Sequence, residues 1–133
     1  MALLHEELTG KILSACFEVS NELGAGFLES VYQKAVTIVL QEKGLEVINE
    51  IPIPVYFRGK VIGNFYAGLL VEQKVIVELK AVSGLTPEHQ AQVINYLKAT
   101  GIDVGLLVNF GRPKLEYKRL ERNLRVQTQP GCE

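Results

Sequence analysis

The chain has 133 residues, the size of one ordinary domain, and its composition of 47% hydrophobic and 22% charged residues is too apolar for a disordered protein. Its net charge of −1 excludes a protein held on nucleic acid by its overall electrostatic field, so any such contact must be local. The longest uncharged run, residues 61–71, is too short and too rich in Gly and Asn to cross a bilayer, and we expect no membrane partner.

The first residues and the cysteines indicate a cytoplasmic protein. The N-terminus has neither the basic leader nor the long apolar stretch of a secretory signal. Cys16 falls in a helical pattern and Cys132 in the terminal tail, so they do not form a disulfide framework, and two separate thiols suit a reducing compartment. We expect Cys16 to be buried as a small apolar residue.

Two amphipathic helices are predicted first. In residues 4–23 apolar side chains recur at steps of three and four, the pattern of one buried helical stripe, and residues 24–26 (Gly-Ala-Gly) end it. A second helix is predicted over residues 27–43, with Gly44 as its C-terminal cap. Its inner side is expected to consist of Leu28, Val31, Ala35, Ile38 and Val39.

The period then changes to two, which indicates strands. Residues 51–57 alternate, and Pro52 and Pro54 cannot donate ladder hydrogen bonds, so this segment is predicted to be an edge strand. Turns at residues 58–60 and 72–74 lead into strands over residues 61–71 and 75–82. The middle of the chain is therefore predicted to be an antiparallel meander.

A third helix and two more strands complete the predicted domain. Thr86 as N-cap, followed by Pro87, begins a helix that runs to about Thr100 and stops at Gly101. Residues 104–110 are a nearly continuous apolar run, typical of a buried strand reached by a helical crossover from the third strand. A last strand over residues 115–120 leaves a polar tail, so we predict one domain over residues 1–120 and a tail over residues 121–133.

The segment 112–125 is the one local concentration of positive charge. Two interpretations stay open: these side chains meet phosphates, or they form a solvated surface. The basic residues of the segment are Arg112, Lys114, Lys118, Arg119, Arg122 and Arg125, against only Glu116 and Glu121.

Chemistry is concentrated on the third strand and the third helix. Glu78 and Lys80 share one face of the strand, where such charges are costly to desolvate unless they pair, bind a metal or line a cleft. A half-exposed surface ion pair is the alternative. Gln92 and Tyr96 are four residues apart, hence on one helix face above the same end of the sheet. Glu29, at the start of the second helix, is also explained by the helix dipole alone.

Together these residues resemble the GxxExxY protein family, a branch of the PD-(D/E)xK nuclease superfamily. Gly26, Glu29 and Tyr32 match the name-giving motif, residues 78–80 (Glu-Leu-Lys) match ExK, and residues 92–96 match the QxxxY motif of the exonuclease-like members. The resemblance covers residues 8–120. It implies an α/β fold with a restriction-endonuclease-like core, in which a mixed central sheet of about five strands is flanked by helices.

The resemblance also implies a chemistry. In the superfamily an aspartate and the ExK glutamate hold Mg²⁺ beside the scissile phosphate, and the lysine positions or deprotonates the attacking water. Mg²⁺ or Mn²⁺ is thus the implied cofactor, and nucleic acid, DNA in preference to RNA, the implied partner. By motif, Glu78 is a metal ligand and, with Lys80, catalytic; Glu29 is a further carboxylate near the metal. The implied site supports or nucleic-acid contacts are Gln92, Tyr96 and Tyr32.

The chain departs from this pattern at Gly68. The family places its aspartate directly before the Leu-Leu-Val of the second strand, where this chain has Gly68. Glycine has no side chain to ligate Mg²⁺, which would be left with Glu78, Glu29, a carbonyl and waters.

Three hypotheses follow. The first is a weakened Mg²⁺-dependent phosphodiesterase in which Glu29 and Glu78 share the ion. The second is a pseudoenzyme, a nuclease fold without turnover that keeps Lys80, Gln92, Tyr96 and the segment 112–125 to bind nucleic acid or a protein partner. The third is a homo-oligomer formed through the edge strand 51–57, although its prolines act against that pairing.

Overall fold

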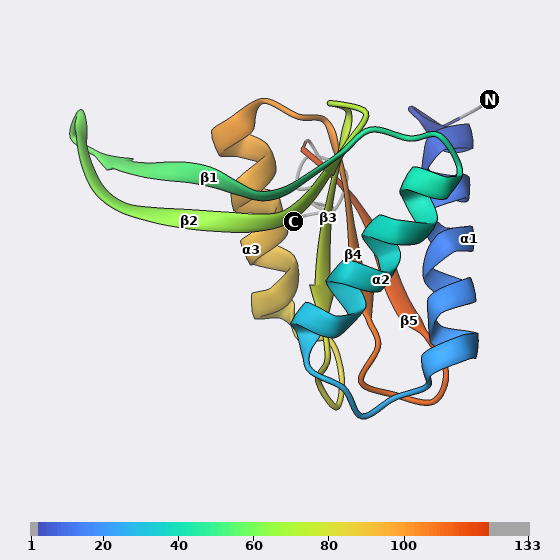
Figure 1. The fold of residues 1–133 in the computed structure, drawn as a ribbon. Coiled ribbons are helices and arrows are strands. Elements are labelled where there is room, and N and C mark those ends of the chain that lie inside the picture. Colours follow the sequence, from blue (N-terminus) through green and yellow to red (C-terminus); the bar gives the residue numbers. More distant parts are fainter. Residues whose placement is uncertain (1–2, 123–133) are drawn as a thin grey trace.

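The computed structural model describes residues 3–122, which form a mixed five-stranded sheet between two layers of helices (Figure 1). The strands lie in chain order, β1 to β5. All neighbouring strands are antiparallel except β3 and β4, which are parallel and are joined by a helical crossover through α3. The predicted α/β fold is therefore confirmed. The elements are α1 (Glu6–Leu23), α2 (Glu29–Glu42), β1 (Val47–Phe57), β2 (Lys60–Val71), β3 (Val75–Lys80), α3 (Pro87–Thr100), β4 (Val104–Asn109) and β5 (Glu116–Glu121).

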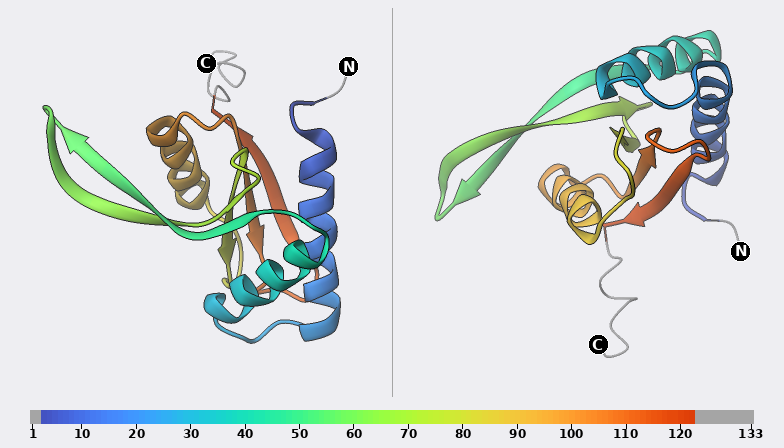
Figure 2. Two further views of the ribbon diagram at one scale, coloured as in Figure 1. Left: turned by 45° about the horizontal axis from the view of Figure 1, so that its top comes forward. Right: turned by 90° about the horizontal axis from the view of Figure 1, so that it is seen from below.

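Each face of the sheet has its own hydrophobic core. Helices α1 and α2 cover one face, and α3 covers the other (Figure 2). Alternation along β3 divides its side chains between the two, so that Val77 packs toward α1 and α2 while Ile76 packs toward α3. Both faces of β4 are buried along its whole length, as the apolar run of residues 104–110 predicts.

The predicted inner face of α2 is wrong in part. Leu28 is 76% exposed and Ile38 is 56% exposed, whereas the fully buried side chains are Tyr32, Val36 and Leu40. Leu28 is the N-cap, outside the helix, so it does not share the helical register. Tyr32, which is absent from the predicted inner side, is buried because its hydroxyl has a hydrogen-bond partner in the Gly24 carbonyl.

The predicted ends of α3 are confirmed. The Thr86 hydroxyl accepts a hydrogen bond from the His89 backbone N–H at 3.2 Å, and His89 Nδ1 accepts one from the Thr86 N–H at 3.0 Å. Gly101 ends the helix with φ of 77°, a left-handed conformation that glycine adopts at little cost.

The hairpin of β1 and β2 extends well beyond the rest of the sheet. β2 pairs with β3 only over residues 69–71, and the hairpin then leaves the sheet and passes α3 into solvent (Figures 1 and 2). We call residues 51–67 the arm. β1 is an edge strand, as Pro52 and Pro54 predict, and a register shift between Val55 and Tyr56 interrupts its pairing near the tip.

Two further expectations concern the environment of Cys16 and membrane-spanning helices. Cys16 is fully buried, and this burial raises the pKa of its thiol to about 12, so it behaves as an apolar core residue; Cys132 lies outside the described residues. None of the helices within residues 3–122 has the length and uninterrupted apolar character that a bilayer crossing requires.

Candidate functional site

The centre of the site lies at the fork where β2 leaves β3. Glu78 and Lys80 project from β3 at this point, with 3.6 Å between Glu78 Oε2 and Lys80 Nζ. Lys80 Nζ also donates a hydrogen bond to Gln92 Oε1 on α3 at 3.0 Å. The side chains of Glu78 and Lys80 are only 11% and 14% exposed, so the pair is not a half-exposed surface ion pair. The structure thus joins three of the predicted residues into one cluster, of which Glu78 is buried and Lys80 and Gln92 are partly buried.

Burial dominates the electrostatics of Glu78. Desolvation raises the pKa of its carboxyl above the ordinary value of 4.5, and the negative charge of Glu29 raises it further. A hydrogen bond of 3.1 Å from the Gly68 backbone N–H to Glu78 Oε1 and the positive charge of Lys80 oppose this rise without cancelling it. The carboxyl therefore takes up a proton more readily in the folded protein than in water.

This raised pKa gives a stability prediction for Glu78→Gln. Between pH 4.5 and the higher pKa of the folded state, the folded protein holds a proton that the unfolded chain has lost, so stability falls as the pH rises through this window. The neutral variant escapes this cost. We expect a higher urea midpoint than the natural chain at neutral pH, with the gain disappearing below pH 4.5. The exposed control Glu22→Gln should leave the midpoint unchanged; a gain for Glu78→Gln that is independent of pH would contradict the argument.

Gly68 lies directly beside Glu78, but its strand is packed too closely to accept a side chain without adjustment. A Cβ atom at this position would lie 2.9 Å from the Val77 carbonyl oxygen. It would also lie 3.6 Å from Glu78 Oε1 and 3.5 Å from Gln33 Oε1. A carboxylate at position 68 would therefore face Glu78, and the Val77 carbonyl would have to shift to admit it.

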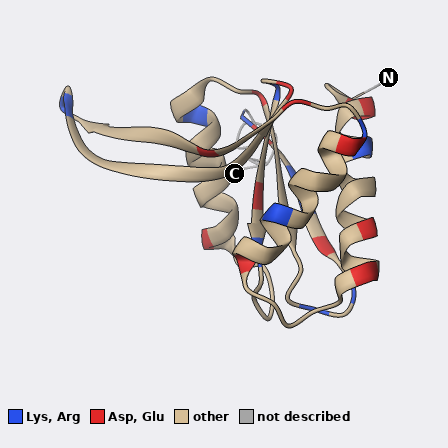
Figure 3. Cartoon of the chain, viewed as in Figure 1, with Lys and Arg blue, Asp and Glu red and all other residues tan. Residues whose placement is uncertain are grey.

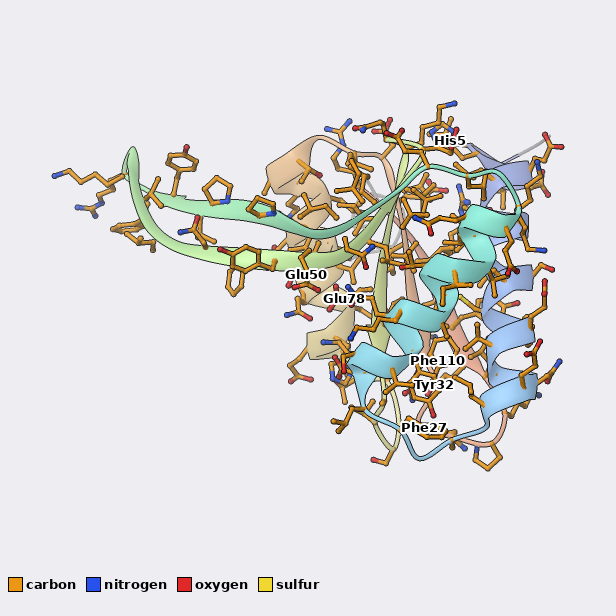
Figure 4. All side chains as sticks on the ribbon, viewed as in Figure 1. His5, Phe27, Tyr32, Glu50, Glu78 and Phe110 are labelled. Atoms are coloured by element: carbon orange, nitrogen blue, oxygen red, sulfur yellow. The ribbon has the colours of Figure 1, made fainter. Side chains whose placement is uncertain are left out.

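A polar contact that the sequence analysis missed flanks this position. Gln33 Nε2 on α2 donates hydrogen bonds to Asn49 Oδ1 at 3.0 Å, to Glu50 Oε2 at 2.8 Å and to the Gly68 carbonyl at 3.2 Å. Glu50 lies on β1 between Asn49 and Ile51, whose partners Leu69 and Ala67 flank Gly68. Its φ of 57° is unusual for a residue other than glycine. Figure 4 shows Glu50 close to Glu78 in projection. The one sequence signal was the polar Asn49-Glu50 pair, which precedes the apolar alternation of β1.

Glu29 and Tyr32 are not part of the cluster formed by Glu78, Lys80 and Gln92. Glu29 is the first residue of α2 and acts on Glu78 through its charge. Tyr32 is fully buried: its hydroxyl donates to the Gly24 carbonyl at 2.6 Å and accepts from the Phe27 N–H at 3.2 Å. Its ring stacks on Phe110 with centroids 4.6 Å apart, and Figure 4 shows these rings at the lower end of the sheet. Tyr32 thus holds the loop that precedes Glu29.

Tyr96 closes the α3 side of the site. It is 4% exposed, and burial, with a smaller contribution from the negative charge of Glu78, raises the pKa of its hydroxyl to about 12. Tyr96 therefore keeps its proton at neutral pH. Together with Gln92 it lines a groove of about 670 Å³ between α3 and the arm, which we call the arm groove.

Asn109 fixes the chain just beyond Lys80. Its fully buried amide accepts a hydrogen bond from the Val82 N–H and donates one to the Val82 carbonyl, both at 2.9 Å. The same amide accepts from the Gly111 N–H at 2.9 Å and donates to Glu116 Oε1 at 3.1 Å. Sequence reasoning missed Asn109 because it ends an otherwise apolar strand.

The predicted basic segment 112–125 is partly neutralised within the protein. Arg119 pairs with Glu121 at 3.1 Å, and Arg122 pairs with Asp103 at 2.6 Å. Arg125 lies outside the described residues. Two of the six positive charges are therefore already engaged, which weakens this segment as a phosphate-binding surface.

The residues present do not fit a preformed site for Mg²⁺ or Mn²⁺. Within residues 3–122 no three His, Cys, Asp or Glu side chains are grouped so that they could hold a metal ion. Both oxygens of Glu78 already face partners, the Gly68 N–H and the Lys80 ammonium. Gly68 contributes no side-chain ligand at the position where the sequence resemblance predicts an aspartate.

Comparison with known proteins identifies the family. In the solved crystal structure of SSO0001, a similar fold aligns with a TM-score of 0.56 over 88% of this chain, at 19% sequence identity, and this chain spans 59% of the length of that protein. At this identity the likeness shows the fold alone. A comparison with curated proteins gave no significant match. The family model described as PD-(D/E)XK nuclease superfamily matches residues 6–120, which include β3 and α3 with the cluster of Glu78, Lys80 and Gln92. The chain belongs to the PD-(D/E)XK nuclease superfamily.

Proposed function

We propose that this protein is a nucleic-acid-binding module of the nuclease superfamily that no longer hydrolyses phosphodiesters. The observation that carries the proposal is the contact between Glu78 and position 68. The backbone N–H of Gly68 donates a hydrogen bond to Glu78 Oε1. Position 68 is where the resemblance to the superfamily predicts a second metal ligand beside Glu78. Within the superfamily we assign the chain to the GxxExxY branch, on the match of Gly26, Glu29 and Tyr32.

The loss of one ligand bears directly on hydrolysis. A divalent ion supplies the nucleophile and neutralises the phosphate, and without it the remaining groups have no equivalent means to activate water at neutral pH. Burial raises the pKa of Glu78, so a proton competes with a metal ion for this carboxylate more strongly than it would in water. Lys80 and Gln92 keep their mutual contact, and both side chains can still donate hydrogen bonds to a phosphate.

The arm supplies the positive charge that a polyanion needs. Residues 51–71 contain Arg58 and Lys60 at the tip of the hairpin and no Asp or Glu (Figure 3). This segment is thus positive in a protein whose net charge is −1. Positive charge at the tip of the arm favours contact of this hairpin with a nucleic-acid backbone.

Fluorescence anisotropy with labelled single-stranded, double-stranded and branched DNA, in EDTA and then in Mg²⁺ or Mn²⁺, tests this function. We expect binding without metal, no cleavage with metal, and little or no heat when either ion is titrated into the protein by calorimetry. Removing Arg58 and Lys60 by alanine substitution should lower the slope of log affinity against log salt by about one per charge.

The double variant Arg112→Ala, Lys114→Ala is the matched control. It removes the same charge from the β4–β5 connection and should leave the slope unchanged. Metal-dependent cleavage by the natural chain, or the absence of binding to every nucleic acid, would overturn the proposal. A slope that changes only in the control variant would move the binding surface to the segment 112–125.

A further inference from the structure

The arm exposes more apolar surface than an isolated hairpin normally does. Its exposed large side chains are Tyr56 (63%), Phe57 (57%), Val61 (52%), Ile62 (66%), Phe65 (50%) and Tyr66 (58%). A two-stranded ribbon gains little stability from its own pairing, and an exposed apolar patch of this kind marks a binding surface. The arm therefore has a structural reason to contact another molecule.

The inner side of the arm and α3 enclose the arm groove. Its aromatic lining comes from Tyr56 and Phe65 on the arm and Tyr96 on α3, with the Phe65 and Tyr96 rings 6.1 Å apart. Polar side chains with hydrogen-bonding capacity stand along the α3 side of the same groove. They are Glu88, Gln92, Asn95 and Lys98.

We propose that the arm groove binds the unpaired bases of a single-stranded nucleic acid, an inference that rests on the proposed function and specifies its ligand. Aromatic side chains stack on the faces of unpaired bases, and amides such as Asn95 bond their edges. In an intact duplex the base faces are already covered by neighbouring bases, so a groove lined by aromatic rings has nothing to stack on. The lining therefore favours a single strand over a duplex.

Continuity with the cluster and the charge of the arm support the same ligand. Gln92 belongs both to the groove and to the contact with Lys80, so a strand whose bases enter the groove has its backbone beside the cluster. Arg58 and Lys60 at the tip, and Lys98 on α3, place positive charge along the same path.

A second copy of this chain fits the arm less well. Pairing along the outer edge of β1 would require backbone donors, and Pro52 and Pro54 provide none. The polar side chains along α3 would also be costly to cover with another apolar arm. Association between copies is therefore treated as an alternative outcome of the test.

The test compares two tyrosines of the same arm. Tyr56 lines the groove and Tyr66 does not, although they are similarly exposed, so alanine at either position should leave the fold intact. Labelled oligo(dT), oligo(U) and a DNA duplex of equal length are titrated in EDTA and followed by anisotropy. We expect both single strands to bind more tightly than the duplex, and Tyr56→Ala to weaken single-strand binding about tenfold. Tyr66→Ala should bind as the natural chain does.

Other results would overturn the inference in distinguishable ways. Tighter binding of the duplex, or equal losses for both tyrosine variants, would remove the groove as a base-binding site while leaving the proposed function intact. Concentration-dependent dimers in light scattering that Tyr56→Ala dissociates, with no effect of that variant on oligonucleotide binding, would assign the groove to a second copy. Failure of every nucleic acid to bind would overturn the proposed function itself.

Discussion

Replacing Gly68 by Asp is expected to give the protein a metal site and metal-dependent cleavage of nucleic acid. The Cβ atom at this position would lie 3.6 Å from Glu78 Oε1, so the new carboxylate would face the one that the ExK motif supplies. Two carboxylates with waters and a substrate phosphate are a ligand set that Mg²⁺ accepts. Lys80 and Gln92 already lie in contact beside it.

The expected gain is large because a direct ligand is being supplied. Even partners that only support a metal ligand change affinity or activity by about tenfold to a hundredfold. We therefore expect cleavage in Mn²⁺ or Mg²⁺ at least about a hundredfold above that of the natural chain. Calorimetry with Mn²⁺ and gel-based cleavage of single-stranded, double-stranded and branched substrates measure the two effects separately.

Gly68→Asn is the matched control for this experiment. Either side chain must displace the Val77 carbonyl, which a Cβ atom would approach to 2.9 Å, at a cost of about 1–3 kcal/mol of stability. Asparagine has nearly the same shape without the charge, so it should lose the same stability and gain no metal. Equal cleavage by the natural chain and Gly68→Asp would refute a decisive role for position 68.

Gly111→Ala is expected to be the most destabilising small substitution near the site. A Cβ atom at Gly111 would overlap the backbone N and O atoms of Val82 and lie 2.8 Å from the Ala81 carbonyl carbon. The Asn109 amide holds the same segments together by hydrogen bonds to Val82 and Gly111, so neither can move without breaking them. We expect a loss of about 3 kcal/mol in the free energy of unfolding, measured by urea denaturation.

Gly84→Ala is the corresponding control. Gly84 lies in the loop after β3 that also contains Val82, but no atom lies within 4 Å of its added Cβ, so the stability of this variant should change by less than about 0.5 kcal/mol. Because Ala81 and Val82 directly follow Lys80, Gly111→Ala should also weaken nucleic-acid binding under conditions where it remains folded. An unchanged urea midpoint for Gly111→Ala would show that the backbone around Gly111 and Val82 can separate freely. The close packing between these two residues would then not be required for stability.

Local rules were sufficient for much of this fold. Thr86, Pro87 and Gly101 act within one helical turn of themselves, so the ends of α3 could be predicted from neighbouring residues alone. Strand geometry likewise places Glu78 and Lys80 on one face. The contact of Lys80 with Gln92 followed from the order of the elements, since a right-handed crossover places α3 over the strand that precedes it.

Prediction failed where a side chain's surroundings come from distant segments. The inward face of α2 begins at Tyr32 because the carbonyl of Gly24 and the ring of Phe110 satisfy that residue, and Phe110 is far away in the chain. The hydrogen bonds from Gln33 to Glu50 and to Gly68 connect α2 to two strands, β1 and β2, that lie further along the chain. No period or spacing in the sequence encodes such contacts.

The amino-acid sequence alone settled that position 68 offers no side-chain ligand for a metal, since glycine has no side chain in any fold. It did not settle that a Cβ atom at this position would approach the Val77 carbonyl to 2.9 Å, nor that the hairpin departs from the sheet to form a groove with α3. These features depend on where two strands stop pairing and on how a helix packs against them. Where the strands stop pairing and how α3 packs depend on contacts across the whole sheet, so only the tertiary structure shows them.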